Sequence, residues 1–197
     1  DHLDYSLDTE VAYYYNGGQL IDTTNILSST LGYFYAKENI ARFYQSVVLQ
    51  SPEFTLKTDT LRYNTLTKIA YSFGPTEIIN KEGAIIYADG GEFRTEISQT
   101  EISSGNIETS EYILDGDKLF FDDFNQYYLG EGNVKLTSKE NNLILLGDEG
   151  YHDKVNGYSK IYGNAIMKKI MKLDTFYIAA DTMMAIESEY DSVRRIL

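Results

Sequence analysis

The sequence feature that most constrains the fold is a unit of two short strands joined at a corner, seen most clearly between residues 56 and 78. Apolar and polar residues alternate around the corner residue Asp59, and they alternate again after Thr67 until Gly74-Pro75 interrupts the pattern. Alternation with a period of two, bounded by turn residues, predicts β-strands that are buried on one face. The unit is therefore predicted to be a strand, a corner and a returning strand.

The same landmarks recur downstream at equal spacing. Asp59 precedes Gly74 by fifteen positions, and Asp117 precedes Gly132 by the same fifteen. A further corner of this kind stands at Asp181. Together with the glycine-containing turns between them, such landmarks fall about every thirty residues, the range expected for stacked supersecondary units. Because one unit cannot bury its apolar face alone, the units are predicted to stack and to share one continuous apolar interior.

Alternation within these units predicts which residues face the interior. Leu114 and Ile161 are expected there. The principal inward residues are predicted to be Phe54, Leu56, Leu61, Tyr63, Ile69, Tyr71, Phe73, Leu119, Phe121, Val134, Leu136, Phe176 and Ile178.

Composition favours an all-β chain and narrows its partners. The 197 residues include 18 Tyr and 9 Phe but no Trp, a mixture that suits half-buried pleated surfaces. The formal net charge of −13 argues against nucleic acid, because a polyanion is held through clustered Lys and Arg. The absence of cysteine excludes disulfides and thiolate metal sites. No apolar run approaches the roughly 18 residues of a membrane-spanning helix.

The acidic residues favour architecture over chemistry. Asp59, Asp117 and Asp181 each occupy a corner, and a catalytic carboxylate is rarely repeated once per structural unit. We expect each of them to accept backbone N–H bonds at its turn. The acidic group that includes Asp115 and Asp122 lacks the ligand spacing of a calcium loop.

The sequence carries no motif for catalysis or for a cofactor. It contains no His-Glu-x-x-His, Gly-x-Ser-x-Gly, Ser-x-x-Lys or Gly-x-x-x-x-Gly-Lys pattern, and its two histidines are His2 and His152. We therefore predict a protein that is not an enzyme, with no catalytic residue, metal site or cofactor. The aromatic runs at 33–35 and 127–128 fit either sugar stacking or cross-strand aromatic pairing, and pairing is favoured because it stabilises sheets.

Several motifs, taken in their order along the chain, resemble those of one known family. They are Thr58-Asp59-Thr60-Leu61-Arg62-Tyr63-Asn64, Phe73-Gly74-Pro75-Thr76, Gly132-Asn133-Val134, Gly163-Asn164-Ala165 and Ala179-Ala180-Asp181-Thr182-Met183. With these motifs the chain resembles the OstA-like, or LptA-like, family of periplasmic lipopolysaccharide-transport proteins, from about Ile21 to Thr182.

The resemblance implies an elongated, twisted β-jelly-roll of stacked antiparallel strands, open at both ends, with a V-shaped apolar groove. It implies one domain over residues 1–197 in a periplasmic protein. Because the sequence starts at Asp1 without Met and stops at Arg194-Arg195-Ile196-Leu197 inside a strand pattern, we expect that a signal peptide has been removed and that the domain continues beyond the C-terminus. Family members shield the acyl chains of lipopolysaccharide in the groove and join end to end by strand addition. The inward residues named above thereby become lipid-groove candidates. The expected partners are lipopolysaccharide or lipid A, other jelly-roll transport proteins, and a second copy joined head to tail.

Two other functions stay open. A fully packed interior would indicate a structural or interaction module of the cell envelope, a β-solenoid that binds no lipid. A carbohydrate-active enzyme would need two carboxylates facing each other across a sugar, and no motif supports one. Whether the interior is an open groove or a closed core decides between the transport protein and the structural module.

Overall fold

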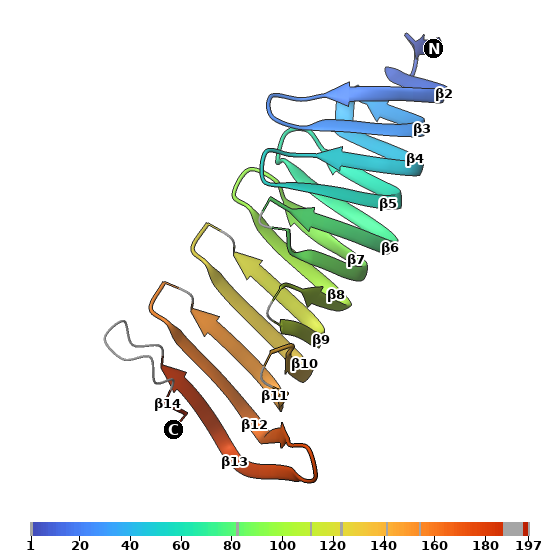
Figure 1. Ribbon diagram of the computed structural model, residues 1–197. Coiled ribbons are helices and arrows are strands. Elements are labelled where there is room, and N and C mark those ends of the chain that lie inside the picture. The colour runs from blue at the N-terminus through green and yellow to red at the C-terminus, as the bar shows by residue number, and fades with distance from the viewer. Residues whose placement is uncertain are drawn as a thin grey trace. The chain divides into compact units, whose positions relative to one another are not determined.

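The chain folds into antiparallel β-strands, which confirms the predicted fold class. A computed structural model describes residues 2–81, 83–110, 112–122, 124–140, 142–153, 155–186 and 195–196. Within these ranges the only helix is the single 3-10 turn Ala36–Glu38 (η1). Consecutive strands lie side by side in chain order within each part of the molecule, as a jelly-roll-like β fold requires (Figure 1).

The chain divides into two compact units, unit 1 over Asp1–Thr100 and unit 2 over Glu101–Leu197. Unit 1 contains β1 (His2–Ser6), β2 (Val11–Ile21), β3 (Ile26–Tyr35), β4 (Ile40–Gln50), β5 (Phe54–Asn64), β6 (Ile69–Asn80) and β7 (Ile85–Arg94). The next strand, β8 (Gln99–Glu108), begins at the boundary. Unit 2 continues with β9 (Tyr112–Asp122), β10 (Tyr127–Ser138), β11 (Leu143–Asp153), β12 (Tyr158–Ile170), β13 (Thr175–Ile186) and β14 (Arg195–Ile196). The single domain implied by the resemblance stays a prediction.

The long strands carry β-bulges near their middles, where the pairing register shifts. A bulge bends its strand, so each long strand is divided into two halves. We call the two sets of half-strands arm A and arm B. Arm A is joined by the loops 22–25, 51–53 and 171–174, and arm B by the turns 36–39, 65–68 and 124–126.

Two of the bulges in unit 2 show why a Gly-Asn pair recurs there. Gly132 and Asn133 have φ angles of 70° and 50°, and the Asn133 Nδ2 donates a hydrogen bond of 2.7 Å to Asp117 Oδ2 on the neighbouring strand. Gly163 and Asn164 repeat the arrangement, with Asn164 Nδ2 2.9 Å from Asp148 Oδ2. A left-handed backbone suits glycine and asparagine better than other residues.

These hydrogen bonds refine the predicted role of the corner aspartates. Asp117 belongs to the architecture, but the hydrogen bond shown there comes from a side-chain amide on the next strand rather than from the backbone. Asp148 holds the second Gly-Asn bulge in the same way. Asp181 lies on β13, across from that bulge on its other side.

The interior of unit 1 lies between the inner faces of its two arms. On arm A an inner row crosses five strands, and we call it the unit 1 row: Leu27, Leu49, Leu56, Ile78 and Ile86. Facing it on arm B is a row in which large and small residues alternate: Phe34, Ala41, Tyr63, Ala70 and Phe93. This alternation lets side chains of neighbouring strands interdigitate, as a dense core requires.

The interior of unit 2 is built from the same positions. Its buried cluster combines Ala165 and Met167 of arm A with Ile161 and Met183 of arm B, and Val134 lies among them. Leu114, Leu143 and Leu145 pack against this cluster but are only partly buried. The two units therefore share one construction and differ in how completely the interior is covered.

Candidate functional site

In unit 1 the predicted groove is a closed core. Leu56, Leu61 and Tyr63 have 0% of their surface exposed, and Phe43 and Val47 have 1%. A ligand could reach these side chains only if the two arms separated. The inner surface of unit 1 is therefore filled by the protein's own side chains.

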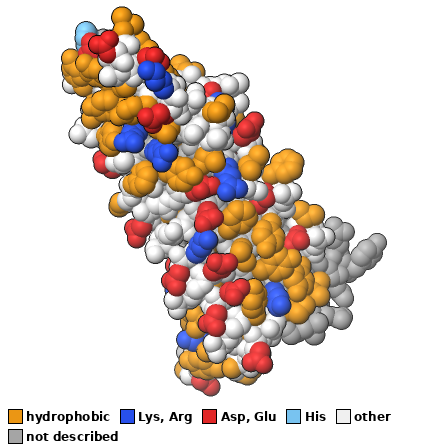
Figure 2. Space-filling view, turned by 180° about the vertical axis from the view of Figure 1, so that it is seen from behind, with side chains coloured by type: hydrophobic (Ala, Val, Ile, Leu, Met, Phe, Trp, Pro, Cys, Tyr) orange, Lys and Arg blue, Asp and Glu red, His pale blue; other side chains and the backbone are white. Residues whose placement is uncertain are grey.

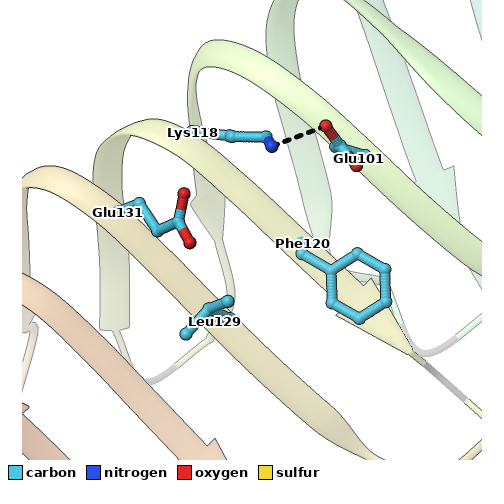
Figure 3. A pocket seen from close by; sticks show the side chains of 5 residues that line it. All are labelled: Glu101, Lys118, Phe120, Leu129 and Glu131. Atoms are coloured by element: carbon cyan, nitrogen blue, oxygen red, sulfur yellow. Dashed lines mark ion pairs between the residues drawn. The ribbon is translucent and has the colours of Figure 1, made fainter.

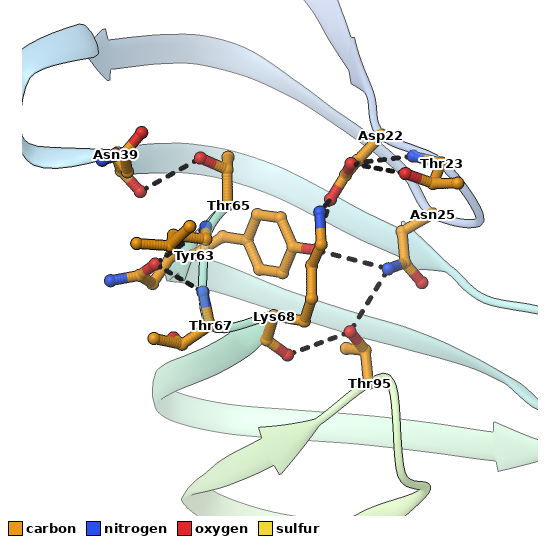
Figure 4. Close-up of polar contacts among 11 residues, drawn as sticks. Asp22, Thr23, Asn25, Asn39, Tyr63, Thr65, Thr67, Lys68 and Thr95 are labelled. Carbon is orange, nitrogen blue, oxygen red and sulfur yellow. Dashed lines mark hydrogen bonds and ion pairs between the residues drawn. The ribbon is translucent and has the colours of Figure 1, made fainter.

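A polar cluster joins the tips of the two arms of unit 1, and we call it the clasp: Asp22, Asn25, Tyr63, Lys68 and Thr95 (Figure 4). The Tyr63 hydroxyl donates to Asp22 Oδ2 at 2.8 Å, and the Lys68 ammonium also binds that oxygen. Asn25 Nδ2 donates to the Tyr63 hydroxyl at 3.3 Å and to Thr95 Oγ1 at 3.2 Å. Asp22 and Asn25 belong to an arm A loop, whereas Lys68 and Thr95 belong to arm B turns, so the clasp holds the mouth of unit 1 shut.

The clasp shifts the ionisation of its own members. Burial acts to raise the pKa of Asp22, but hydrogen bonds from Lys68, Tyr63 and the Thr23 backbone outweigh it and lower that pKa to about 2. Burial, together with the hydrogen bond to the Asp22 carboxylate, raises the pKa of Tyr63 to about 12. Asp22 is therefore charged and Tyr63 neutral at neutral pH. Asn25 Oδ1 is buried and has no hydrogen-bond partner within the described part of the chain, so the clasp is not fully satisfied.

In unit 2 the equivalent arm A row is left partly open. We call it the unit 2 row: Leu114, Leu136, Leu145, Met167 and Ile178, each paired with the next across neighbouring strands. Met167 is buried with 8% of its surface exposed, Ile178 is 40% exposed, and the other three are half-buried. This row is a continuous apolar strip that borders the buried cluster and still reaches solvent.

The small residues of arm B explain part of this opening. Opposite the cluster, the inner face of arm B carries Gly130 and Gly150 between Leu119 and Ile161. A Cβ at Gly150 would lie 3.0 Å from Val134 Cγ1, so Val134 fills the space next to the bend. Glycines have no side chain that could reach over the outer part of arm A. At Gly130 and Gly150 the inner face of arm B therefore carries less side-chain volume than at Phe43 and Leu61 of unit 1.

Ten of the thirteen predicted groove residues fall into three groups. Leu56, Leu61, Tyr63, Leu119, Phe121 and Val134 are buried in the two interiors. Phe54 and Leu136 are half-buried on inner faces. Phe176 and Ile178 lie on β13 and are 51% and 40% exposed. Their predicted contact with lipid stays a prediction.

The remaining predicted residues, Ile69, Tyr71 and Phe73, do not share the inner face with Leu61 and Tyr63. The pairing of β5 with β6 sets Leu61 opposite Ser72 and Tyr63 opposite Ala70. Residues directly opposite each other point to the same side of the sheet, so Ile69, Tyr71 and Phe73 point to the other side. The expectation of a common inner face is therefore wrong for these residues, and Phe73 is 55% exposed.

Some residues of the two interiors were not predicted from the sequence. Leu145 and Met167 line the unit 2 row, but Leu145 lies in a run of four apolar residues, 143–146, in which no alternation is visible. The clasp residues Asp22 and Lys68 are 46 positions apart, and no local pattern connects them. The spacing of Asp148 from Gly163, the same fifteen positions as at the other corners, could have indicated the second Gly-Asn bulge.

A shallow pocket of about 180 Å³ lies on the outer face of unit 2, lined by Glu101, Lys118, Phe120, Leu129 and Glu131 (Figure 3). Lys118 Nζ lies 2.9 Å from Glu101 Oε1, and the hydrogen bond and charge of Glu101 raise the pKa of Lys118. The lysine is therefore already paired by the protein. Within the described residues no group of three or more His, Cys, Asp or Glu side chains is arranged to hold a metal ion.

The aromatic runs pair across strands, as the sequence favoured. Tyr33 stacks on Tyr13, directly opposite, with ring centroids 6.1 Å apart, and Tyr128 stacks on His152 at 5.9 Å. On the face drawn in Figure 2, hydrophobic side chains form separate patches among acidic and basic ones. In the described part of the chain no helix has the length and apolar character needed to cross a membrane.

The family model described as OstA-like protein matches residues 1–59, which run from the first strand to the corner residue Asp59. The resemblance drawn from the motifs is thus confirmed over this range, and the match extends it to residues before Ile21. A search of curated proteins found no match.

Proposed function

We propose that this chain is a periplasmic lipopolysaccharide-binding protein that shelters acyl chains in an apolar groove and passes them between protomers joined edge to edge. The OstA-like match to residues 1–59 supports a role related to lipopolysaccharide transport. The observation that carries the proposal is the unit 2 row, an apolar strip that remains partly open beside a buried cluster. Unit 1, whose interior is closed, has the role of a structural body.

The physical basis of the proposed binding is hydrophobic transfer. Each methylene group removed from water contributes about 0.8 kcal/mol, and neighbouring strands are spaced about 4.8 Å apart. A row across five strands therefore offers a track roughly 19 Å long for an acyl chain. Such binding needs no basic clamp, which agrees with the net charge of −13.

The proposed transfer between protomers uses the ends of the strand order. β1 pairs with β2, and among the residues that the structure describes no other strand pairs with its second edge. Exposed edges recruit strands from other chains. The proposed partners are thus other jelly-roll transport proteins or a second copy of this chain.

Photo-crosslinking tests the proposal. A photoreactive residue is placed at Leu136 or Leu145 in the unit 2 row and, as matched controls, at Leu56 or Leu61 in the unit 1 core. With lipid A in detergent-free vesicles, we expect crosslinks from the unit 2 positions and at least fivefold fewer from the controls. Equal crosslinking at all four positions, or none at any, contradicts the proposed groove. Circular dichroism of each variant verifies that the strands have formed.

The closed core of unit 1 favours a second function, a structural or interaction module of the cell envelope that binds no lipid. The complete burial of Leu56, Leu61 and Tyr63 is the observation behind it. The two functions separate in thermal unfolding, because a ligand that binds only the folded state raises its stability. A midpoint that does not change with saturating lipid A, together with no crosslinks, would favour the structural module.

A further inference from the structure

The arm B turns of unit 1 are joined into one ordered edge, which we call the ledge: residues 7–10, 36–39, 65–68 and 95–98. Each turn ends in a residue with a left-handed backbone. In the first three turns the carbonyl oxygen of this residue accepts a backbone hydrogen bond from the first residue of the next turn, at 3.2, 2.9 and 3.1 Å. Thr65 and Thr95 also donate their hydroxyls to these oxygens, those of Asn39 and Lys68 (Figure 4). Backbone bonding therefore continues through the turns, and the ledge is ordered by itself.

Three turns of the ledge place a large apolar side chain in solvent. Leu7 is 82% exposed, Leu66 is 73% exposed and Ile97 is 49% exposed. Turns ordinarily carry Gly, Pro, Asn, Asp or Ser, and a side chain that is mostly in water adds little to the packing of the core. The folding of unit 1 therefore does not explain these three residues.

The apolar tips are a property of arm B and not of hairpins in general. In unit 1 the arm A loops 22–25 and 51–53 contain no large aliphatic or aromatic residue. Unit 2, taken by itself, has the same feature in its arm B turns, where Phe124 and Val155 follow β9 and β11 and are mostly exposed. The recurrence at the same kind of turn indicates a function for this edge of the sheet.

The spacing of the tips fits a lipid surface better than a protein partner. Consecutive arm B turns are two strands apart, about 9.6 Å, so each apolar tip stands singly among polar turn residues. A protein partner buries a contiguous patch, whereas the headgroup region of a bilayer admits each protruding side chain separately. A row of single tips on an ordered edge is therefore suited to a bilayer.

The charges of the ledge select the kind of lipid. Both of its lysines are already held by carboxylates, Lys37 at 3.1 Å from Glu10 and Lys68 by Asp22. The exposed acids of the ledge form no ion pair among the residues that the structure describes: Asp8, Glu38 and Glu96. An anionic lipid surface would repel these carboxylates. The ledge is therefore complementary to a zwitterionic headgroup.

We propose that the ledge binds the surface of a zwitterionic phospholipid bilayer, with Leu7, Leu66 and Ile97 inserted among the headgroups. The burial of these side chains drives the binding, and the ordered backbone keeps the entropy cost low. The ledge lies at the arm B turns of unit 1 and not along the unit 2 row. The inference thus goes beyond the proposed function and does not rest on acyl-chain binding.

Tryptophan fluorescence tests insertion, because the chain contains no tryptophan of its own. Full-chain Leu66→Trp is mixed with vesicles of phosphatidylcholine and phosphatidylethanolamine, and we expect a blue shift and at least twofold quenching by brominated phosphatidylcholine. Ile21→Trp is the matched control, since Ile21 is 74% exposed at the end of β2 beside an arm A loop, and its emission should not change.

Two results of this experiment overturn the proposal. The first is an unchanged emission of Leu66→Trp, or an equal change in Ile21→Trp. The second is a blue shift that appears without vesicles and grows with protein concentration, because it would assign the ledge to contact between copies of the chain.

Vesicle flotation of serine variants assigns the contacts. Leu66→Ser and Ile97→Ser are each expected to weaken binding at least threefold and the double variant at least tenfold, whereas Ile21→Ser should change it less than twofold. Replacing half of the zwitterionic lipid with phosphatidylglycerol should also weaken binding at least threefold. Unchanged binding of the double variant, or tighter binding to the anionic vesicles, overturns the proposal. Circular dichroism of each variant verifies the fold.

Discussion

The two units use the same strand–bulge–strand construction, yet one interior is closed and the other is partly open. In the unit 1 row Leu27, Leu49 and Leu56 are fully buried, whereas in the unit 2 row Leu136 and Leu145 are half-buried. Backbone pairing is equivalent in the two rows, so it cannot be the cause. We attribute the difference to the side chains that arm B places opposite each row. Closure of this fold is therefore decided by a few side chains and not by the sheet itself.

The largest effect is expected from emptying the centre of unit 1. Tyr63→Ala removes a fully buried ring and the hydroxyl of the clasp, and we expect a loss of about 3–5 kcal/mol in the free energy of unfolding. Tyr71→Ala, on the outer face, is the matched control and should cost less than about 1 kcal/mol. Urea unfolding measures both. Equal losses would show that the Tyr63 site is not a packed core.

The clasp should contribute less than the core but should give unit 1 a pH dependence of its own. Asp22→Asn removes the charge that pairs with Lys68 and is expected to cost about 1–3 kcal/mol at neutral pH. Because folding lowers the pKa of Asp22 from 3.8 to about 2, the charge stabilises the fold above pH 4 and the gain is lost as the pH falls towards 2.

The contribution of Tyr63 to the stability of the clasp depends on pH in the opposite direction. Folding raises the pKa of Tyr63 from 10.0 to about 12, so its contribution is complete below pH 10 and is lost as the pH rises to 12. Denaturant unfolding at a series of pH values measures both limbs. In Asp22→Asn the free energy of unfolding should fall less between pH 4 and pH 2 than in the unchanged protein. If it falls by the same amount, other carboxylates cause the loss of stability in acid.

Leucine truncation in the two rows compares the units directly. Leu56→Ala in unit 1 should cost about 3–4 kcal/mol, because a cavity remains in a closed core. Leu145→Ala in unit 2 should cost about 1–2 kcal/mol, because water or lipid can occupy the space beside a half-buried side chain. Urea unfolding of each variant gives the two values. If the Leu145 variant loses as much as the Leu56 variant, the unit 2 row is not open.

The sequence predicted the strands, the corners and the fold class, because alternation and turn residues are local signals. It could not predict that Leu61 and Tyr71 point to opposite sides, because the register of β5 with β6 fixes that choice. It also could not predict the clasp, since Asp22 and Tyr63 meet only after the arms have folded. Whether the interior of a unit is open or closed depends on such contacts between distant residues. The groove residues were therefore harder to predict from the sequence than the strands and corners.

The smallest difference is expected at the bulges, where the two units hold their bends differently. Gly74 in unit 1 has a φ of 86°, and a Cβ there would meet no atom within 4 Å. Gly132 in unit 2 has a φ of 70°, and a Cβ would lie 2.5 Å from Asp117 Oδ2, the acceptor of the Asn133 bond.

Alanine at either glycine should therefore cost about 1–2 kcal/mol through the left-handed backbone alone. Gly132→Ala should cost about 0.5–1 kcal/mol more, because the added methyl group displaces Asp117 and breaks its hydrogen bond to Asn133. A double-mutant cycle with Asn133→Ala isolates that second part. If Gly132→Ala and Gly74→Ala cost the same in urea unfolding, the Asp–Asn contact adds nothing to the bend.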